Sequence, residues 1–360
     1  MRSPRRAAAI FLVALSTTAS ACATPAWWPQ PPAPADPAAA PRSAAANWLI
    51  SRFDPTSKLI PSEFVPGAAD PGGSAYAVTS LKLAGVGGAT ASDAVAALAP
   101  LVNVHAQDNA GADKPGALAR LILAVRSTGG NPRSFGGTDL VARLEATVVT
   151  SGPNAGRFGV QDATYDGAFR QGLALAALST ISPRPATITP GAGGVNALPA
   201  VAWLRSQQCS DGSWMPSRAN LDVPCAPDPV TFASPDSNST ALAVLGLRAV
   251  NAAGAQSAGA WFTSVRELDG GWAFDASPFS STDPDSTGLV MAALRALGTP
   301  PDVNARAALL GFQFGAGAAA ADQGAFYYPP FSGPPVPNVL ATNDAILGLA
   351  SGVWPANLVS

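Results

Sequence analysis

The stretch QQCSDGSW (207–214) and the segment DSNSTALAVLGL (236–247) recur downstream as ELDGGW (267–272) and DPDSTGLVMAAL (283–294). In both copies an Asp-Gly pair, which favours a tight turn, comes shortly before a tryptophan. Ser and Thr then precede a run rich in Ala and Leu, and such hydroxyl groups accept hydrogen bonds from the free amides of a helix start. Because the run lacks a wide polar face, it predicts a helix that is buried on most sides.

The small polar pair and its helical run occur six times along the chain. The copies begin at Gly73-Ser74, Pro115-Gly116, Arg170-Gln171, Ser239-Thr240, Ser286-Thr287 and Ala341-Thr342, and the second and third are the weaker ones. The second residues of successive copies lie 42 to 69 residues apart, near the range of two-helix repeats. We therefore expect each buried helix to have a partner helix in the same repeat.

A more polar helical segment precedes each copy. These segments cover residues 43–53, 91–103, 138–149, 196–208, 255–267 and 303–313. Side chains such as Arg205, Arg266 and Glu267 indicate that these helices face solvent. Six buried helices inside six solvent-facing ones predict an all-α fold, an α/α barrel (toroid) of about six helix pairs. An open solenoid built from the same pairs is the alternative.

The N-terminal residues have the features of an export signal. Arginines at positions 2, 5 and 6 precede an apolar stretch too short to span a bilayer, and Ala19-Ser20-Ala21 offers the small residues that a signal peptidase accepts. We expect a signal peptide at 1–21, a Pro- and Ala-rich tether at 22–42, the barrel at 43–354 and a tail at 355–360. The protein is then secreted, or held at the cell envelope by a lipid on Cys22.

The composition limits the classes of partner. The chain has 360 residues, 48% of them hydrophobic and 12% charged, with a formal net charge of −2. A nucleic-acid backbone requires clustered cations, which this sequence lacks beyond its N-terminus, so we expect no nucleic-acid partner. No later segment has about 18 uninterrupted apolar residues, so a lipid anchor is the one membrane attachment that we expect.

Two cysteines remain once Cys22 is set aside. An oxidising compartment favours a disulfide between Cys209 and Cys225, and two metal-ligating thiolates are the alternative. The single histidine, His105, is interpreted as a solvated residue at a helix end. Because zinc sites need three or four protein ligands, we expect no metal site.

The repeated segments quoted first resemble units of the prenyltransferase and squalene-cyclase superfamily, whose members fold as α/α toroids. This resemblance covers about residues 43–354. GALARLILAVRSTGG (116–130) and YDGAFRQGLALAALS (165–179) are also similar to the helical domain of transcobalamin and intrinsic factor, the corrinoid carriers. That second resemblance implies a cobalamin-like ligand. Apart from it, we expect no cofactor.

The segment from Asp283 to Thr287 (DPDST) resembles the Asp-x-Asp-Asp-Thr motif of class II terpene cyclases, and Asp285 matches its central acid. The resemblance implies that Asp285, with Asp283 beside it, donates a proton to an alkene. Such an acid needs a dry cavity, a hydrogen-bond network and a partner acid. Ser286 stands where the motif has its third Asp. Helix capping by either aspartate is the alternative.

Aromatic and polar residues near the starts of the buried helices should gather at one mouth of the barrel. The residues that we expect to bind a ligand there are Trp214, Trp272, Phe274, Phe326, Tyr327, Tyr328, Tyr165, Asp236, Thr240, Thr287, Asn343 and Gln171. An aromatic rim with a few polar groups suits an apolar ligand, a sugar or a peptide. The alternative is that the rings only cover helix ends.

Three functions are consistent with these observations. The first is a non-catalytic exported binding protein that holds a hydrophobic or corrinoid-like small molecule, or an envelope component, in its aromatic-rimmed mouth. The second is an enzyme similar to terpene cyclases or prenyltransferases, with Asp285 as general acid. The third is a protein-interaction module of the envelope.

Overall fold

The computed structural model describes residues 36–159, 167–216, 218, 222–226, 234–330 and 332–359. The chain divides into a unit from Met1 to Asp36 and a unit from Pro37 to Ser360, and all described helices belong to the second. The predicted signal peptide, most of the tether, Cys22 and Tyr165 lie outside the described residues.

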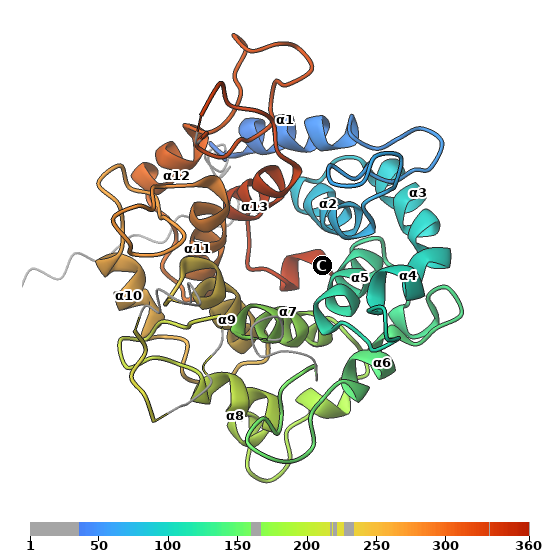
Figure 1. Cartoon of the computed structure of the whole chain (residues 1–360), viewed down its shortest axis with the longest axis vertical. Helices are drawn as coiled ribbons and strands as arrows, with labels where there is room; N and C mark the ends of the chain where they lie inside the picture. Colours follow the sequence, from blue (N-terminus) through green and yellow to red (C-terminus); the bar gives the residue numbers. More distant parts are fainter. Residues whose placement is uncertain are drawn as a thin grey trace, which may run out of the picture. The chain divides into compact units, whose positions relative to one another are not determined.

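Six helices form an inner ring (Figure 1). They are α2 (Pro71–Ala84), α5 (Pro115–Ser127), α7 (Ala168–Ser179), α9 (Ser237–Ala249), α11 (Pro284–Ala296) and α13 (Val339–Leu349). Each packs against the next one along the chain, and α13 packs against α2, so the ring is closed. The predicted α/α toroid is confirmed, and the open solenoid is wrong.

The remaining α-helices surround this ring on the outside (Figure 1). They are α1 (Ala39–Ile50), α3 (Gly88–Leu98) with the short α4 (Val102–Ala106), α6 (Leu140–Ala146), α8 (Pro199–Ser206), α10 (Ala258–Ser264) and α12 (Val303–Leu310). Helix α1 begins at Ala39, inside the segment predicted to be a tether that runs to residue 42. These residues are helical because α1 packs against α13 and α2 where the ring closes, a tertiary contact that the local sequence does not indicate.

The closing junction between the first and last repeats is rich in polar contacts. The buried Arg42 donates a hydrogen bond to the carbonyl oxygen of Leu349 at 2.6 Å. On the inner side, Ser80 of α2 donates to the side-chain oxygen of Asn343 in α13 at 2.7 Å. The N- and C-terminal repeats are therefore joined by specific hydrogen bonds as well as by apolar packing.

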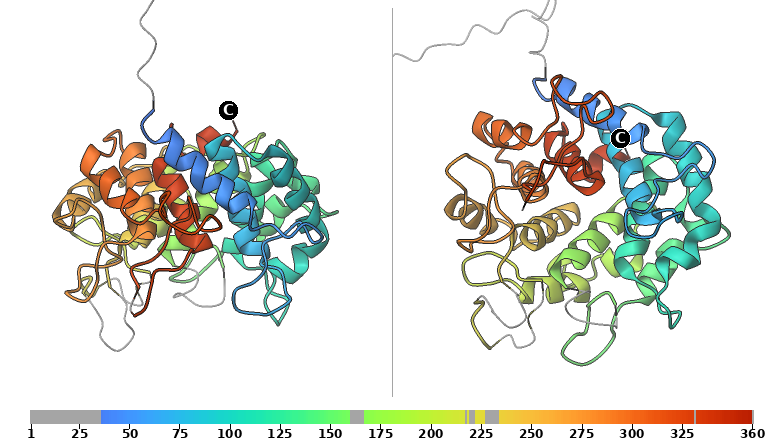
Figure 2. Two further views of the ribbon diagram at one scale, coloured as in Figure 1. Left: turned by 90° about the horizontal axis from the view of Figure 1, so that it is seen from above. Right: turned by 45° about the horizontal axis from the view of Figure 1, so that its top comes forward.

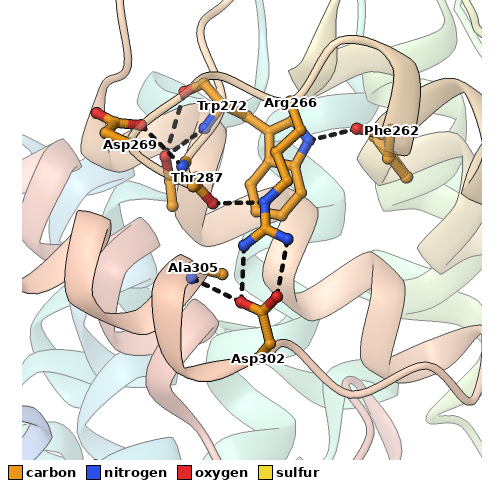
Figure 3. A network of polar contacts seen from close by, with 9 residues as sticks. Phe262, Arg266, Asp269, Trp272, Thr287, Asp302 and Ala305 are labelled. Atoms are coloured by element: carbon orange, nitrogen blue, oxygen red, sulfur yellow. Dashed lines mark hydrogen bonds and ion pairs between the residues drawn. The ribbon is translucent and has the colours of Figure 1, made fainter.

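In the last four repeats an aromatic turn ties the outer helix to the next inner helix, as Figure 3 shows for α10 and α11. The backbone amide of Trp272 donates to the hydroxyl of Thr287 at 3.0 Å, and its indole nitrogen donates to the carbonyl oxygen of Phe262 at 2.7 Å. The guanidinium of Arg266 lies 5.1 Å from the centre of the same ring and pairs with Asp302. The tryptophan thus satisfies polar groups at both helix ends while filling the space between them.

The same arrangement is found in other repeats. The amide of Trp214 donates to the hydroxyl of Thr240 at 2.9 Å, and the amide of Phe158 donates to the side-chain oxygen of Gln171 at 2.7 Å. In most inner helices the receiving residue is the fourth of the helix. In α5, which begins at Pro115, that position is Leu118, so the predicted second copy was placed two residues too early.

Glycines let two pairs of inner helices approach almost backbone to backbone. A Cβ atom added to Gly172 of α7 would lie 2.0 Å from the carbonyl oxygen of Leu242 in α9. One added to Gly288 of α11 would lie 2.2 Å from the carbonyl oxygen of Asp344 in α13. Only a residue without a side chain fits these crossings.

The segment after α13 closes one end of the ring. The short helix η5 (Ala356–Leu358) packs against α2 and α5, and Trp354 and Leu358 are buried. Figure 1 shows the C-terminus near the middle of the ring, and Figure 2 places it at the end opposite the long loops. The predicted tail is therefore part of the packed body up to Val359, the last residue described.

Cys209 and Cys225 form the predicted disulfide, with their sulfur atoms 2.05 Å apart, and the metal-thiolate alternative is wrong. Among the described residues, no group of three or more acidic, histidine or cysteine side chains could hold a metal ion. None of the described helices has the length and hydropathy needed to cross a membrane. The disulfide is compatible with an extracellular protein.

Candidate functional site

The sixth residue of each inner helix faces the centre of the ring. These residues are Tyr76, Arg120, Leu173, Leu242, Leu289 and Asp344, and all six line a central space of about 20 Å³. The leucines come from α7, α9 and α11, and the polar residues come from the neighbouring helices α13, α2 and α5. One wall of the centre is therefore apolar, and the other carries ionisable groups.

Two aspartates from neighbouring helices meet at this centre. Asp344 is buried in α13, where the hydroxyl of Tyr76 donates a hydrogen bond to its carboxylate. Asp285, the second residue of α11, is partly exposed and within hydrogen-bonding reach of Asp344. The side-chain amide of Asn238 donates to Asp285 at 3.1 Å. Together the two carboxyl groups form an acid pair, the Asp285–Asp344 pair.

The pair cannot lose both protons easily. Burial raises the pKa of Asp285, and it raises the pKa of Asp344 well above the ordinary value. The charge of Asp285 raises the pKa of Asp344 further, because like charges close together in a dry site repel. Because the two carboxyl groups are coupled, they titrate as a unit.

The neighbours of the pair can stabilise the charge left after a proton leaves. Arg120 lowers the pKa of both aspartates, and its guanidinium lies 4.2 Å from the centre of the Tyr76 ring. Tyr328 hydrogen-bonds with Asp285, and burial raises the pKa of the Tyr328 hydroxyl. Both tyrosines therefore keep their protons and can act as hydrogen-bond donors. Arg120 is therefore the positive charge that faces the pair.

Two cavities lead to the pair from the mouth of the ring. The larger, of about 420 Å³, has Tyr76, Arg120 and Asn343 in its lining, and the second, of about 310 Å³, has Asp285. Tyr328 borders both cavities. These volumes are in the range of small-molecule sites. A ligand in the mouth can thus reach the acid pair, although Asp344 itself is buried.

Five of the predicted site residues border these two cavities. They are Phe274, Asp283, Asp285, Tyr328 and Asn343. Asp283 also caps α11 by accepting the amide hydrogen of Ser286 at 2.8 Å, and burial raises the pKa of Asp283 to about 6. The capping interpretation therefore fits Asp283, whereas Asp285 lies one residue inside the first turn with its carboxyl group in the acid pair.

Other predicted rim residues are buried structural residues. Trp214, Trp272 and Phe326 have almost no exposed surface, because they fill the space between outer and inner helices. The alternative that the rings cover helix ends fits the burial of these three, while their predicted contact with a ligand stays a prediction. Tyr327 packs against Phe312 and donates its hydroxyl hydrogen to the carbonyl oxygen of Gly311, at the end of α12.

The polar residues predicted to bind a ligand beside these rings also form hydrogen bonds with backbone amides. Thr240, Thr287 and Gln171 are fully buried and pair with the amides of the aromatic turns, so they are not available to a ligand. Asp236 is buried at the start of α9, where it accepts the amide hydrogen of Ser239. In each case the residue stabilises the loop-to-helix junction.

His105 is less solvated than the sequence suggested. Its ring lies beside Gly72, its Nε2 atom is buried without a hydrogen-bond partner among the described residues, and burial lowers its pKa to about 4. The imidazole is therefore neutral and packs behind the start of α2.

The residues that sequence reasoning missed are Tyr76, Arg120, Asn238 and Asp344. For Tyr76, Arg120 and Asp344 the signal is position, because the same place in α7, α9 and α11 holds leucine, whereas Asn238 is the second residue of its helix, the place that Asp285 has in α11. Asp344 stands in the run NDAILGL, where a charged residue interrupts an otherwise apolar buried helix. A buried charge in such a place requires a partner, and that requirement points to a site.

No protein-family model and no curated protein sequence matches this chain. Solved structures of similar fold nevertheless cover most of it. An unsaturated glucuronyl hydrolase from Bacillus sp. GL1 is 11% identical, with a TM-score of 0.55, and the match covers 86% of this chain and 95% of the hydrolase. The type II terpene cyclase MstE from Scytonema is 16% identical, with a TM-score of 0.52 and coverage of 87% and 96%.

A protein from Actinoplanes is similar to this chain over 90% of its length and 100% of its own, at 15% identity and a TM-score of 0.50. The chain thus has the α/α toroid fold that terpene cyclases and glucuronyl hydrolases share, and the predicted resemblance to the prenyltransferase and squalene-cyclase fold is confirmed. Enzymes use this fold. The similarity to transcobalamin stays a prediction.

Proposed function

We propose that the protein is an enzyme in which the Asp285–Asp344 pair donates a proton to a carbon–carbon double bond of an uncharged, largely apolar substrate. The observation that carries this proposal is the pair itself, two neighbouring carboxyl groups of which one, Asp285, borders a ligand-sized cavity while the other, Asp344, is buried behind it. The sequence alone suggested Asp285 as an acid, and Asp344 is the partner acid that such chemistry requires.

In the proposed step, the O–H bond of the protonated carboxyl group breaks and the π electrons of the substrate form a new C–H bond. The electron pair of the O–H bond stays on the acid pair, where Asn238 and Tyr328 donate hydrogen bonds to Asp285 and Arg120 balances the charge. The adjacent carbon of the substrate becomes cationic. Loss of a neighbouring proton, or addition of water and loss of its proton, returns one proton to the pair, so the reaction is redox-neutral.

The lining of the larger cavity favours an uncharged substrate. Its charged side chains are Glu63, Asp70 and Arg120, and the acid pair balances the single cation. A phosphate or carboxylate group would have no cluster of cations to bind among these residues. Apolar side chains such as Phe64 and Leu340 occupy much of the remaining wall.

The names of two structural neighbours support the choice of an unsaturated substrate. One is an unsaturated glucuronyl hydrolase, and another structure holds the cyclase MstE with geranylgeranyl dihydroxybenzoate as its substrate. The name of the hydrolase specifies an unsaturated substrate, and the geranylgeranyl group bound to the cyclase contains carbon–carbon double bonds. At these identities the neighbours establish the fold alone, so the activity of this chain rests on its own acid pair.

The test is incorporation of deuterium from deuterium oxide into a panel of uncharged prenyl alcohols, with an unsaturated glucuronyl disaccharide as the charged comparison. We expect the wild-type protein to label at least one prenyl alcohol at carbon, read by mass spectrometry. Asp285→Asn and Asp344→Asn should each lower the labelling rate by about 10²–10⁴-fold, the usual contribution of a general acid. Asp93→Asn, at an exposed surface ion pair with Lys58, serves as control and should not change the rate.

Labelling at the wild-type rate by both asparagine variants would contradict the proposed chemistry. A protein that binds panel members, but labels none of them, would instead be the non-catalytic binding protein that the sequence also suggests. In that case Asp285→Asn should leave the affinity nearly unchanged. Corrinoid binding and protein interaction at the envelope stay predictions.

A further inference from the structure

Arg120 has hydrogen-bond donors that the described part of the protein does not use. Its side chain is half-buried and lines the 420 Å³ mouth cavity. A guanidinium carries five N–H groups, yet no hydrogen bond or ion pair joins that of Arg120 to any described residue. Donors in a partly buried place are satisfied by water or by a ligand. The open donors of Arg120 therefore mark a place where a ligand can bind.

The position of the guanidinium is fixed by stacking. It lies 4.2 Å from the centre of the Tyr76 ring, and the Tyr76 hydroxyl donates a hydrogen bond to Asp344, which holds that ring in turn. Stacking uses the face of the guanidinium and leaves the N–H groups in its plane free to donate. Arg120 thus offers a planar set of donors from a supported position.

A second side chain in the same lining also has an unused donor. The side-chain oxygen of Asn343 accepts a hydrogen bond from Ser80 at 2.7 Å, and its nitrogen is buried without a partner among the described residues. The acidic residues of the lining are placed differently. Asp70 caps α2 by accepting the amide hydrogen of Gly73, and Glu63 is exposed. This wall of the cavity therefore favours a ligand that carries a hydrogen-bond acceptor.

We propose that Arg120 determines specificity by donating hydrogen bonds to a carbonyl oxygen, so that the substrate is an uncharged prenyl ketone, aldehyde or ester. This inference rests on the proposed function for the site that is used, and it concerns binding and not proton transfer. A carboxylate in the same place would be repelled by the charge of Asp285 and Asp344, which Arg120 faces. Tyr328 borders this cavity and the one lined by Asp285, so the sites for the carbonyl group and for the double bond are neighbours.

The expected signature is a preference for a carbonyl group among ligands that share one carbon skeleton. The series is geranylacetone, the alcohol formed by reducing its ketone, and the diene in which a methylene replaces the carbonyl group. Hydrogen bonds from a charged donor should lower the dissociation constant of the ketone by about 10–100-fold relative to the diene. The alcohol also offers an acceptor and should bind with intermediate affinity.

Headspace gas chromatography over solutions of the full-length protein measures the free ligand and so gives each dissociation constant. Arg120→Met keeps an unbranched apolar stem and removes the donors, so the ketone should lose its advantage over the diene. Arg120→Lys, the variant to use if Arg120→Met does not fold, keeps the charge without the planar fork and should retain only part of the preference. Because ketone and diene are compared within one variant, a general loss of packing does not imitate this result.

Arg52→Met is the matched control. Arg52 also stacks on an aromatic ring, 5.1 Å from the centre of the Trp48 ring, but it follows the outer helix α1 and does not line the mouth cavity. This variant should keep the wild-type preference for the ketone.

Equal affinity of the wild-type protein for ketone and diene would overturn the inference, as would a full preference in both Arg120 variants or an equal loss in Arg52→Met. Absence of binding by all three compounds would also overturn it. A carbonyl preference without any deuterium labelling of substrates would leave Arg120 as part of a binding site and remove only the proposed acid catalysis. Labelling of prenyl alcohols without a carbonyl preference would remove only the role of Arg120. The two proposals therefore fail separately.

Discussion

At the scale of single residues, Asp236 and Asp302 both begin a helix by accepting an amide hydrogen, from Ser239 at 2.7 Å and from Ala305 at 2.8 Å. Their surroundings differ. Asp236 is buried, its Oδ2 atom has no hydrogen-bond partner in the described part of the chain, and burial raises its pKa to about 7. Asp302 is exposed, and hydrogen bonds from Arg266 lower its pKa.

Asp236→Asn should make the protein more stable above neutral pH. The folded state holds a proton on Asp236 that the unfolded state loses above its ordinary pKa of about 3.9. That stabilising contribution is complete in acid and is lost as pH rises through about 7. Asparagine caps as well as aspartate and does not ionise. We expect the melting temperature of the variant to match wild type near pH 4 and to exceed it by several degrees near pH 8.

Asp302→Asn is the control with the opposite sign. Because the pKa of Asp302 is lowered in the folded state, its contribution is present near neutral pH and is lost as pH falls. The variant should therefore be less stable than wild type near pH 7, by a modest amount because the ion pair is on the surface. If the two variants show the same pH dependence, the burial of Asp236 does not control its titration.

At the scale of helices, some neighbouring inner helices pack more closely than others. Gly172 of α7 meets Gly246 of α9, and Gly288 of α11 meets Gly348 of α13, at distances that exclude any side chain. Such contacts bring the two backbones together and leave the layer of larger side chains to face the ring centre. Glycine is costly inside a helix, so its presence at these positions indicates that close packing outweighs its low helix propensity.

Gly172→Ala tests this packing. A methyl group there would lie 2.0 Å from the carbonyl oxygen of Leu242, a backbone atom, so the two helices must separate. We expect a loss of about 1–3 kcal/mol in the free energy of unfolding, measured by chemical denaturation. Gly259→Ala in α10 is the control, since its nearest atom is Leu297 Cδ1 at 3.7 Å. That substitution should stabilise the protein by about 0.5–1 kcal/mol, and equal effects of both would contradict the packing argument.

Much of the element order follows from local chemistry, which explains why the repeats could be predicted. Asp-Gly turns, the capping residues and the Ala- and Leu-rich runs act over a few residues, and they indicated both helices of every repeat. The centre of the ring depends instead on which faces of six distant helices meet. In the sequence, Asp344 is a charged residue in an otherwise apolar helix. Only closure of the ring brings its carboxyl group next to Asp285. The start of α1 at Ala39 could not be predicted for the same reason, because α1 packs against α13 and α2, which are not adjacent to that residue in the sequence.

At the scale of the whole molecule, the disulfide is a constraint added to a ring that already closes through its helices. Cys209 and Cys225 are 16 residues apart, and they restrict one loop between α8 and α9. Reduction should lower the free energy of unfolding by about 3 kcal/mol and leave the helical content unchanged. Circular dichroism melts with and without a reductant measure this, and the Cys209→Ser/Cys225→Ser double variant should be insensitive to the reductant. Loss of helical signal at room temperature would mean that the ring depends on the bridge.

The polar junction between the first and last repeats makes the site depend on closure of the ring. Tyr76 comes from α2, while Asn343 and Asp344 come from α13, so partners more than 260 residues apart must find each other before the acid pair exists in its final form. Such contacts of high sequence separation form late, because loop-closure entropy opposes them until the intervening chain is ordered. A chain truncated before α13 could fold its early helix pairs and would still lack the chemistry. The proposed reactivity toward alkenes would then arise only after α13 has folded against α2 and closed the ring.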